Sequence, residues 1–134
     1  MGFIGILVLS CSKDKDTQSN RCELETIQSA GKYITAPSDE LTIESLEIED
    51  DCLKIAFLSG GCQGDTWEVK LIDSDAILES NPPQRNLRLS LKNRETCEAL
   101  IKKEITFDVS NLQVDGKKVQ LNLTNSGDKV LYEY

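Results

Sequence analysis

The chain has 134 residues with a hydrophobic content of 39%, which suits one soluble domain with its own core. Its 23 acidic residues outnumber 15 Lys and Arg residues, for a formal net charge of -8, which disfavours binding to nucleic acid or to an anionic membrane surface. No His is present, so neither a Ser–His nor a Cys–His nucleophile can be assembled, and most hydrolase mechanisms are excluded.

Residues 1–10 are predicted to be a signal peptide. Their run of eight apolar or small residues is too short to span a bilayer but is typical of the hydrophobic part of a secretory signal. Val8, Ser10 and Cys11 resemble the lipobox of bacterial lipoproteins, in which the Cys is acylated and becomes the first residue, whereas Leu9 departs from that motif. The alternative for this stretch is a buried strand with a free Cys.

Residues 11–20 are predicted to be the lipidated Cys and a flexible tether, since the stretch after Cys11 has no apolar residue to bury. Residues 21–134 are predicted to form a single domain. At its start, capping and apolar spacing predict a short helix over Asn20–Gly31, and Tyr33–Ala36 is expected to be a short edge segment ended by a Pro.

Two successive hairpins are predicted in the middle of the chain. Leu46 and Ile48 alternate with polar residues and are expected to pair with the strand 53–57, so that Ile48 faces Leu53. That strand is in turn expected to pair with 67–71, because one register puts all six of their apolar side chains on one face. A change of parity near Ser45 predicts a β-bulge.

The second half of the chain also predicts short strands. The long connection 73–85 is expected to cross from one sheet to the other, and strands are predicted over 87–91 and 105–109. A last hairpin is predicted to place Leu121 opposite Tyr132. Together these elements predict an all-β fold: an antiparallel β-sandwich of about seven or eight strands, immunoglobulin-like in general shape, with at most one short N-terminal helix.

The five cysteines predict two disulfides and one lipidated residue. In an exported protein, an odd number of Cys residues leaves one without a disulfide partner. Lipidation of Cys11 would account for that residue and leave four Cys to pair. Cys52 and Cys62 lie at opposite ends of a strand, roughly 20 Å apart against a limit near 7 Å, so they cannot be bridged. Two pairings remain, and the strand 87–91 is expected to run in the same direction as 53–57, which would bring Cys97 to the end where Cys62 lies. We therefore favour Cys62 with Cys97 and Cys22 with Cys52. Zinc binding is disfavoured because there is neither His nor a C-x-x-C spacing.

One loop is a candidate binding site, because its three Gly residues allow a backbone to approach a ligand closely. The alternative is that these Gly residues only supply turn geometry beside a disulfide. No catalytic, cofactor or metal site is predicted. The acidic residues of 40–51 could be considered as calcium ligands, but they lack EF-hand spacing. The candidate binding residues are Ser59, Gly60, Gly61, Gln63, Gly64 and Asp65.

Four segments carry a wider resemblance: DDCLKIAFLSGGC, NPPQRNLRLSLKNRETCEALI, ITFDVSNLQVDGK and VLYEY. They resemble a group of small Bacteroidota lipoproteins of unknown function. The resemblance implies an exported, lipid-anchored domain with no established activity.

From these observations we expect an outer-membrane lipoprotein of the cell envelope, attached to the membrane by its lipid and monomeric. The first functional hypothesis is a non-catalytic binding or accessory module with a protein or glycan partner. The alternative is a structural or envelope-maintenance role without a ligand. A carboxylate-based hydrolase comes third, because seven aromatic residues, three of them expected in the core, leave little to line a sugar site.

Overall fold

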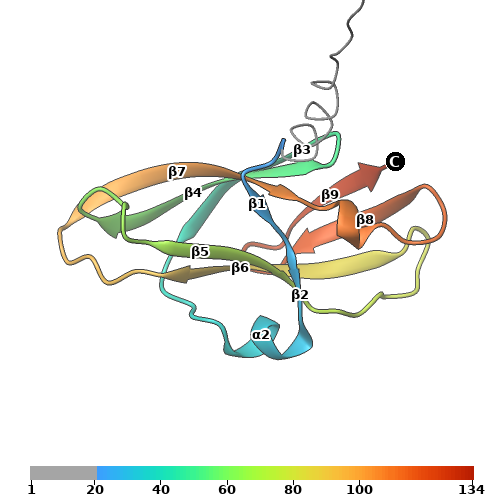
Figure 1. Ribbon diagram of the computed structural model, residues 1–134, viewed down its shortest axis with the longest axis horizontal. Helices are drawn as coiled ribbons and strands as arrows, with labels where there is room; N and C mark the ends of the chain where they lie inside the picture. The colour runs from blue at the N-terminus through green and yellow to red at the C-terminus, as the bar shows by residue number, and fades with distance from the viewer. Residues whose placement is uncertain (1–20) are drawn as a thin grey trace, which may run out of the picture.

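The computed structural model describes residues 21–134. The predicted signal peptide, the lipidated Cys11 and the tether lie outside these residues. The ordered elements (Figure 1) are β1 (Leu24–Glu25), β2 (Ile27–Gln28), α2 (Ala30–Thr35), β3 (Thr42–Glu49), β4 (Cys52–Gly61), β5 (Glu68–Asp73), β6 (Gln84–Lys92), β7 (Ala99–Asp108), the 3-10 turn η1 (Ser110–Leu112), β8 (Lys118–Leu123) and β9 (Asp128–Glu133).

The strands form two packed sheets, which confirms the all-β sandwich class. The four-stranded sheet has the order β1-β7-β4-β3 and the five-stranded sheet the order β2-β5-β6-β8-β9. In Figure 1 the strands β4 and β7 lie above β5 and β6, and α2 lies below them. Most neighbours are antiparallel, but the pairs β1–β7, β2–β5 and β6–β8 are parallel. The strands number nine within 21–134, of which β1 and β2 have two residues each.

The core lies between the two sheets and is built from the alternating apolar residues of both. Phe57 of β4 contacts Trp67, just before β5, with ring centroids 5.9 Å apart. Odd-numbered residues of β4 and β6 point inward, as the alternation predicts. Fully buried core residues include Leu53, Ile55, Phe57, Leu71, Leu87, Leu89, Leu91, Phe107, Val119, Leu121 and Tyr132.

The first predicted hairpin is confirmed and the second is wrong. Ile48 pairs with Leu53, and the register shifts between Ile43 and Ser45, where the bulge is expected. The other neighbour of β4 is β7, whereas β5 lies in the opposite sheet beside β6. The six apolar residues do share one interior, but they meet across the sandwich. An alternating pattern defines the buried face of a strand and not whether its partner lies beside it or opposite it.

The last hairpin forms, but its register differs by two residues from the prediction. Leu121 pairs with Val130, and Val119 pairs with Tyr132. The turn comprises residues 124–127 and ends at Gly127, whose φ of +84° is a conformation that favours Gly. A shift of two residues leaves every side chain on the same face, so the pattern alone cannot distinguish the two registers.

The N-terminal helix predicted over Asn20–Gly31 is wrong within the described residues. The chain there runs as β1 and β2, which pair with β7 and β5 and so join both sheets. The helix α2 begins only after Ser29, whose side chain accepts a hydrogen bond from the amide of Lys32. It therefore includes most of Tyr33–Ala36, the expected edge segment. Pairing with two open sheet edges outweighs the local helix signal.

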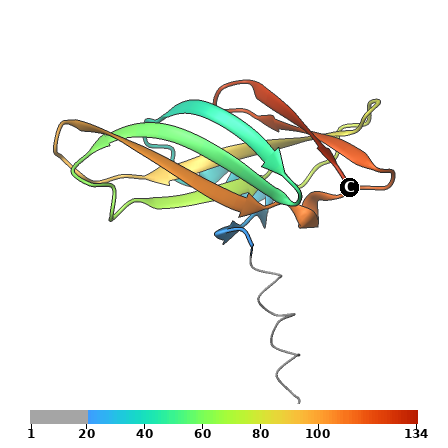
Figure 2. The same ribbon diagram turned by 90° about the horizontal axis from the view of Figure 1, so that it is seen from above.

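The connection 73–85 does not cross between sheets, contrary to the prediction, since β5 and β6 are antiparallel neighbours in one sheet. The chain instead changes sheet in the shorter loops after β4 and after β6. Figures 1 and 2 both place these two loops together at one end of the molecule. That end contains the predicted binding loop.

Candidate functional site

Two disulfides lie at opposite ends of β4, with the pairing that the sequence favours. Cys22 is bonded to Cys52 with a Cα–Cα distance of 5.6 Å, and Cys62 is bonded to Cys97 with a Cα–Cα distance of 4.8 Å. The ten residues of β4 separate the two bridges, which at about 3.3 Å per residue is roughly 30 Å. We call these the Cys52 end and the Cys62 end of the molecule.

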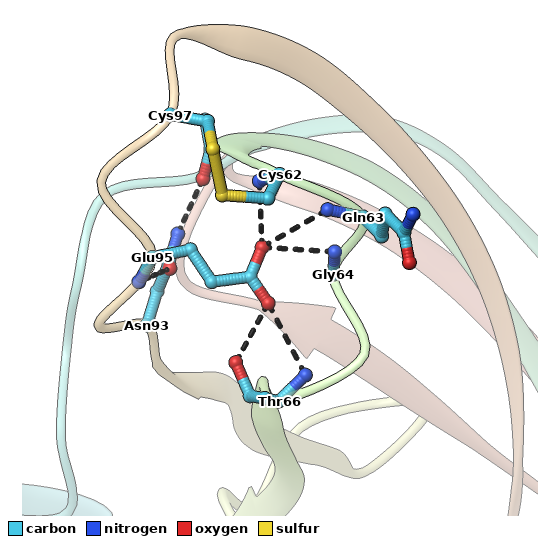
Figure 3. The surroundings of a disulfide bond; sticks show 8 residues. Cys62, Gln63, Gly64, Thr66, Asn93, Glu95 and Cys97 are labelled. Carbon is cyan, nitrogen blue, oxygen red and sulfur yellow. Dashed lines mark hydrogen bonds between the residues drawn. A yellow bond between two sulfur atoms is a disulfide. The ribbon is translucent and has the colours of Figure 1, made fainter.

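At the Cys62 end, the predicted binding loop closes around a carboxylate of the protein itself. Oε1 of Glu95 accepts hydrogen bonds from the backbone amides of Cys62, Gln63 and Gly64, at 2.7, 3.2 and 2.9 Å. Oε2 accepts from the amide of Thr66 at 3.2 Å and from its hydroxyl at 2.7 Å. Figure 3 shows the carboxylate held between this loop and the Cys62–Cys97 disulfide.

These hydrogen bonds change the acidity of Glu95. The Thr66 hydroxyl, followed by the amide of Gly64, lowers the pKa of Glu95 to about 2, because both donate to the ionised carboxylate. The side chain therefore stays charged through the neutral and mildly acidic range. Consecutive amides that converge on one anion form a nest, and here the anion is built into the chain.

The Gly residues of the loop follow from this arrangement. A Cβ on Gly61 would lie 2.6 Å from Oε1 of Glu95 and 3.2 Å from Nε1 of Trp67. Gly64 has a φ of +78°, and a Cβ there would lie 2.7 Å from Cε of Lys103. Close packing and turn geometry thus account for two of the three Gly residues, and both contacts come from within the protein.

Asn93 supports the same loop from the other side. Its Nδ2 donates to the carbonyl of Gly60 at 2.6 Å and to the hydroxyl of Ser59 at 3.1 Å, while its Oδ1 accepts from the amide of Glu95 at 2.9 Å. The amide of Asn93 donates to Asp39 at 2.7 Å. Sequence reasoning missed Asn93 and Glu95, because each contacts a loop about 33 positions earlier in the chain.

The six candidate binding residues differ in burial and in hydrogen bonding. Ser59 is buried and donates its hydroxyl to the carbonyl of Glu40 at 2.7 Å. Gln63 and Gly64 use their amides on Glu95, Gly61 is packed against it, and Gly60 and Asp65 are exposed. Three amides of the loop are therefore occupied by Glu95, and its flank toward β3 is open.

That flank forms a shallow open groove of about 490 Å³ on the outer face of the four-stranded sheet. Most of its lining is polar, and we call the apolar pair Leu58 and Leu100 its floor and the acidic pair Asp39 and Glu40 its rim. Among the described residues that line it, none is Lys, Arg or aromatic. The lining residues are Asp39, Glu40, Leu41, Thr42, Leu58, Ser59, Gly60, Asn93, Glu95, Cys97 and Leu100.

Leu100 is the most exposed part of the groove floor, with 70% of its surface accessible. In the β4–β7 ladder it is paired with Gly60, which has no side chain to cover it. Leu58 lies on the same face of the sheet, two residues before Gly60, and is paired with Lys102. An apolar strip thus remains open to solvent beside the Cys62–Cys97 disulfide.

The Cys52 end is held by different chemistry. The phenol of Tyr132, which is fully buried, donates to Oδ1 of Asp51 at 2.5 Å and accepts from the side chain of Gln113 at 2.9 Å. Burial, followed by the hydrogen bond to Asp51, raises the pKa of Tyr132 above its ordinary value. The amide of Val109 donates to the carbonyl of Asp51 at 2.9 Å, so this turn is tied to both sheets.

A buried ion pair joins the last residue of β5 to the start of β6. Arg85 donates to Asp73 at 2.9 Å and to the carbonyl of Leu112 at 3.0 Å, with 8% and 0% of the Arg85 and Asp73 side chains exposed. Burial raises the pKa of Asp73, and the Arg85 charge opposes that effect. Both side chains are shielded from solvent, which favours a structural role.

Two features are absent from residues 21–134. No group of three or more His, Cys, Asp or Glu side chains there is arranged to hold a metal ion. No helix in the same range is long and apolar enough to cross a membrane.

No protein-family model and no curated protein matches the chain. Three solved structures share its fold. A NigD-like immunity protein from Bacteroides caccae matches with a TM-score of 0.59 and 12% identity, over 81% of this chain and 58% of that one. A protein of unknown function, DUF1344, from Bacteroides vulgatus matches with a TM-score of 0.53 and 13% identity, over 83% of this chain and 57% of that one.

A putative toxin-related protein from Parabacteroides distasonis matches with a TM-score of 0.52 and 18% identity, over 81% of this chain and 61% of that one. The chain therefore spans about 60% of the length of these proteins. At such identities the likeness concerns the fold alone.

Proposed function

We propose that the protein is a lipid-anchored module of the bacterial outer membrane that binds a protein partner and has no catalytic activity. The main support for this proposal is the state of the five Cys residues. Four of the five form two disulfides, which suits an oxidising compartment outside the cytoplasm. The fifth, Cys11, directly follows the apolar run and lipobox-like residues of the predicted signal peptide.

The position of the anchor relative to the groove supports a binding role. Arg21, the first described residue, lies at the Cys52 end, where it pairs with Asp50 at 3.8 Å. The groove lies at the Cys62 end, at the far end of β4. A lipid attached through the chain ahead of Arg21 would therefore leave the groove directed away from the point of attachment.

The state of the carboxylates supports a non-catalytic role. A hydrolase that uses two carboxylates needs one of them protonated near neutral pH, as a general acid. Glu95, in the wall of the groove, has its pKa lowered to about 2 and is poorly suited to donate a proton. Asp73, whose pKa is raised, is completely buried against Arg85.

The partner is a protein in this proposal, although a glycan was an equal expectation from the sequence. Sugar-binding sites commonly stack a sugar ring on an exposed aromatic side chain. Trp67 is buried, with 8% of its surface exposed, and the groove lining contains no aromatic residue. Among proteins of similar fold, one is described as an immunity protein and one as toxin-related, and neither description names an enzymatic reaction.

The anchor is tested by mass spectrometry of the full chain extracted from the membranes of a host with a lipoprotein pathway. The wild-type chain should begin at Cys11 and carry a diacylglycerol on its sulfur. Cys11→Ser should lose this mass and leave the membrane fraction, whereas Ser12→Ala, the matched control at the next position, should keep both. An unmodified amino terminus on the wild-type chain would refute the anchor.

A further inference from the structure

The groove at the Cys62 end combines an exposed apolar floor with uncompensated negative charge. Leu100 and Leu58 supply the floor. Among the five ion pairs of the described residues, none includes Asp39 or Glu40 on the rim. Both acids therefore add to the negative potential over an apolar strip, a combination that favours a cationic group on an apolar chain.

The backbone around the groove is already hydrogen-bonded within the protein. β3 begins opposite Leu58, so Ser59 and Gly60 have no β3 partner on that side. The carbonyl of Gly60 nevertheless accepts from Asn93, and the hydroxyl of Ser59 donates to the carbonyl of Glu40. A ligand that binds here by adding a strand would have to displace these bonds, so recognition rests on side-chain contacts and charge.

We propose that this groove binds an extended segment of a protein in which a basic side chain alternates with an apolar one. The apolar side chain packs on Leu58 and Leu100, and the basic one lies beside Glu40 and Asp39. The proposal names the partner chemistry for the binding role above and rests on that role, but it does not depend on lipidation. It excludes nucleic acid and anionic lipid as occupants, because both carry the wrong charge.

The test uses the full, 15N-labelled chain in a non-ionic detergent and a capped peptide of sequence Lys-Leu-Lys-Leu-Lys as the probe. Backbone NMR shifts on titration should concentrate at 39–42, 58–60 and 97–100. Two comparison peptides separate the contributions: Glu-Leu-Glu-Leu-Glu reverses the charge, and Lys-Ser-Lys-Ser-Lys removes the apolar side chains. Both should bind at least about tenfold more weakly than the probe, as expected when one of two contributions is lost.

Matched variants locate the site. Leu100→Ser should weaken probe binding about tenfold, and Glu40→Gln about threefold with a smaller dependence on salt. Ile34→Ser, at a residue 78% exposed on α2, and Glu79→Gln, on the connection between β5 and β6, should leave affinity within about twofold. The NMR spectrum of each free variant shows whether it remains folded.

Several outcomes overturn the proposal. Equal binding of the Lys-Ser peptide would mean non-specific charge attraction, and equal loss in the control variants would place binding elsewhere. If sedimentation shows that the chain dimerises and Leu100→Ser abolishes the dimer, the occupant is a second copy instead. If mass spectrometry finds no lipid on the chain but the chain still binds the probe peptide, the anchor is refuted and this inference is supported. The two proposals are therefore tested separately.

Discussion

The two ends of β4 are closed by bridges of similar span but are stabilised by different groups. The bridged residues are 30 positions apart at the Cys52 end and 35 apart at the Cys62 end. At the Cys62 end a charged carboxylate, Glu95, accepts five hydrogen bonds from an exposed loop. At the Cys52 end a buried neutral phenol, Tyr132, joins one sheet to the turn of the other. Because the two bridges are so similar, differences in stability between the two ends reflect the groups around each bridge and not the bridge itself.

The largest effect should come from removing either bridge. Cys22→Ser with Cys52→Ser, and Cys62→Ser with Cys97→Ser, should each lower the free energy of unfolding by roughly 4 kcal/mol, because the closed loops are nearly equal in length. Urea unfolding followed by Trp67 fluorescence measures both. If the losses of unfolding free energy in the two double variants differ by more than about 1 kcal/mol, local contacts and not loop entropy determine the stability of one end.

Tyr132→Phe should lower the free energy of unfolding by about 1–2 kcal/mol, since it removes the hydrogen bonds to Asp51 and Gln113 but keeps the buried ring. Because the folded-state pKa of Tyr132 is raised, its stabilising effect is complete below pH 10 and is lost as the pH rises further. Tyr134→Phe, which removes a less buried hydroxyl bonded to Val114, is the matched control and should cost less. Equal costs would contradict the special position of Tyr132.

Gly64→Ala should destabilise the Cys62 end by more than Gly127→Ala destabilises the last hairpin. Both residues have positive φ, +78° and +84°, so each substitution carries about 1 kcal/mol of backbone strain. A new Cβ at Gly64 also meets Lys103 at 2.7 Å, whereas at Gly127 nothing lies within 4 Å. Thermal unfolding of the two variants gives the difference. The Lys103 atom lies near the end of a flexible side chain, so equal melting temperatures of the two variants would show that Lys103 moves aside and that backbone strain alone remains.

The smallest effect near neutral pH is expected for Glu95→Gln, because the side chain is only half-buried and its charge is partly screened by solvent. The pKa of Glu95 falls from 4.5 to about 2 on folding. Its stabilising effect is therefore complete above pH 4.5 and is lost as the pH falls toward 2. The melting temperature of the wild type should decline more steeply than that of the variant across this range. Parallel profiles would show that the carboxylate adds nothing.

The sequence predicted which side chains point inward better than which strands are neighbours. Leu53, Ile55 and Phe57 are all buried as expected, because burial follows from period-2 alternation in one strand. The pairing of that strand with 67–71 failed, because the same alternation is satisfied by a neighbour in the sheet and by a strand in the opposite sheet. Neighbour choice depends on the topology of the whole chain, which a local pattern does not contain.

The disulfides and the candidate site show the same limit. The length of β4 places Cys52 and Cys62 too far apart to bridge and so excludes one of three Cys pairings, and the expected direction of the strand 87–91 decided between the other two. Glu95 closes a loop about 30 positions earlier in the chain, and nothing in a local pattern announces such a contact. The amides of the predicted binding loop bind an internal carboxylate, and the open groove lies beside that loop.

The Cys22–Cys52 bridge also determines how mechanical load enters the fold. Tension applied to the chain ahead of Arg21 meets this covalent link before it reaches the short strands β1 and β2. The force passes into β4, which is hydrogen-bonded to β3 on one side and to β7 on the other. A strand with a partner on each side cannot be peeled from an open sheet edge, so the domain should resist extraction while the bridge is intact.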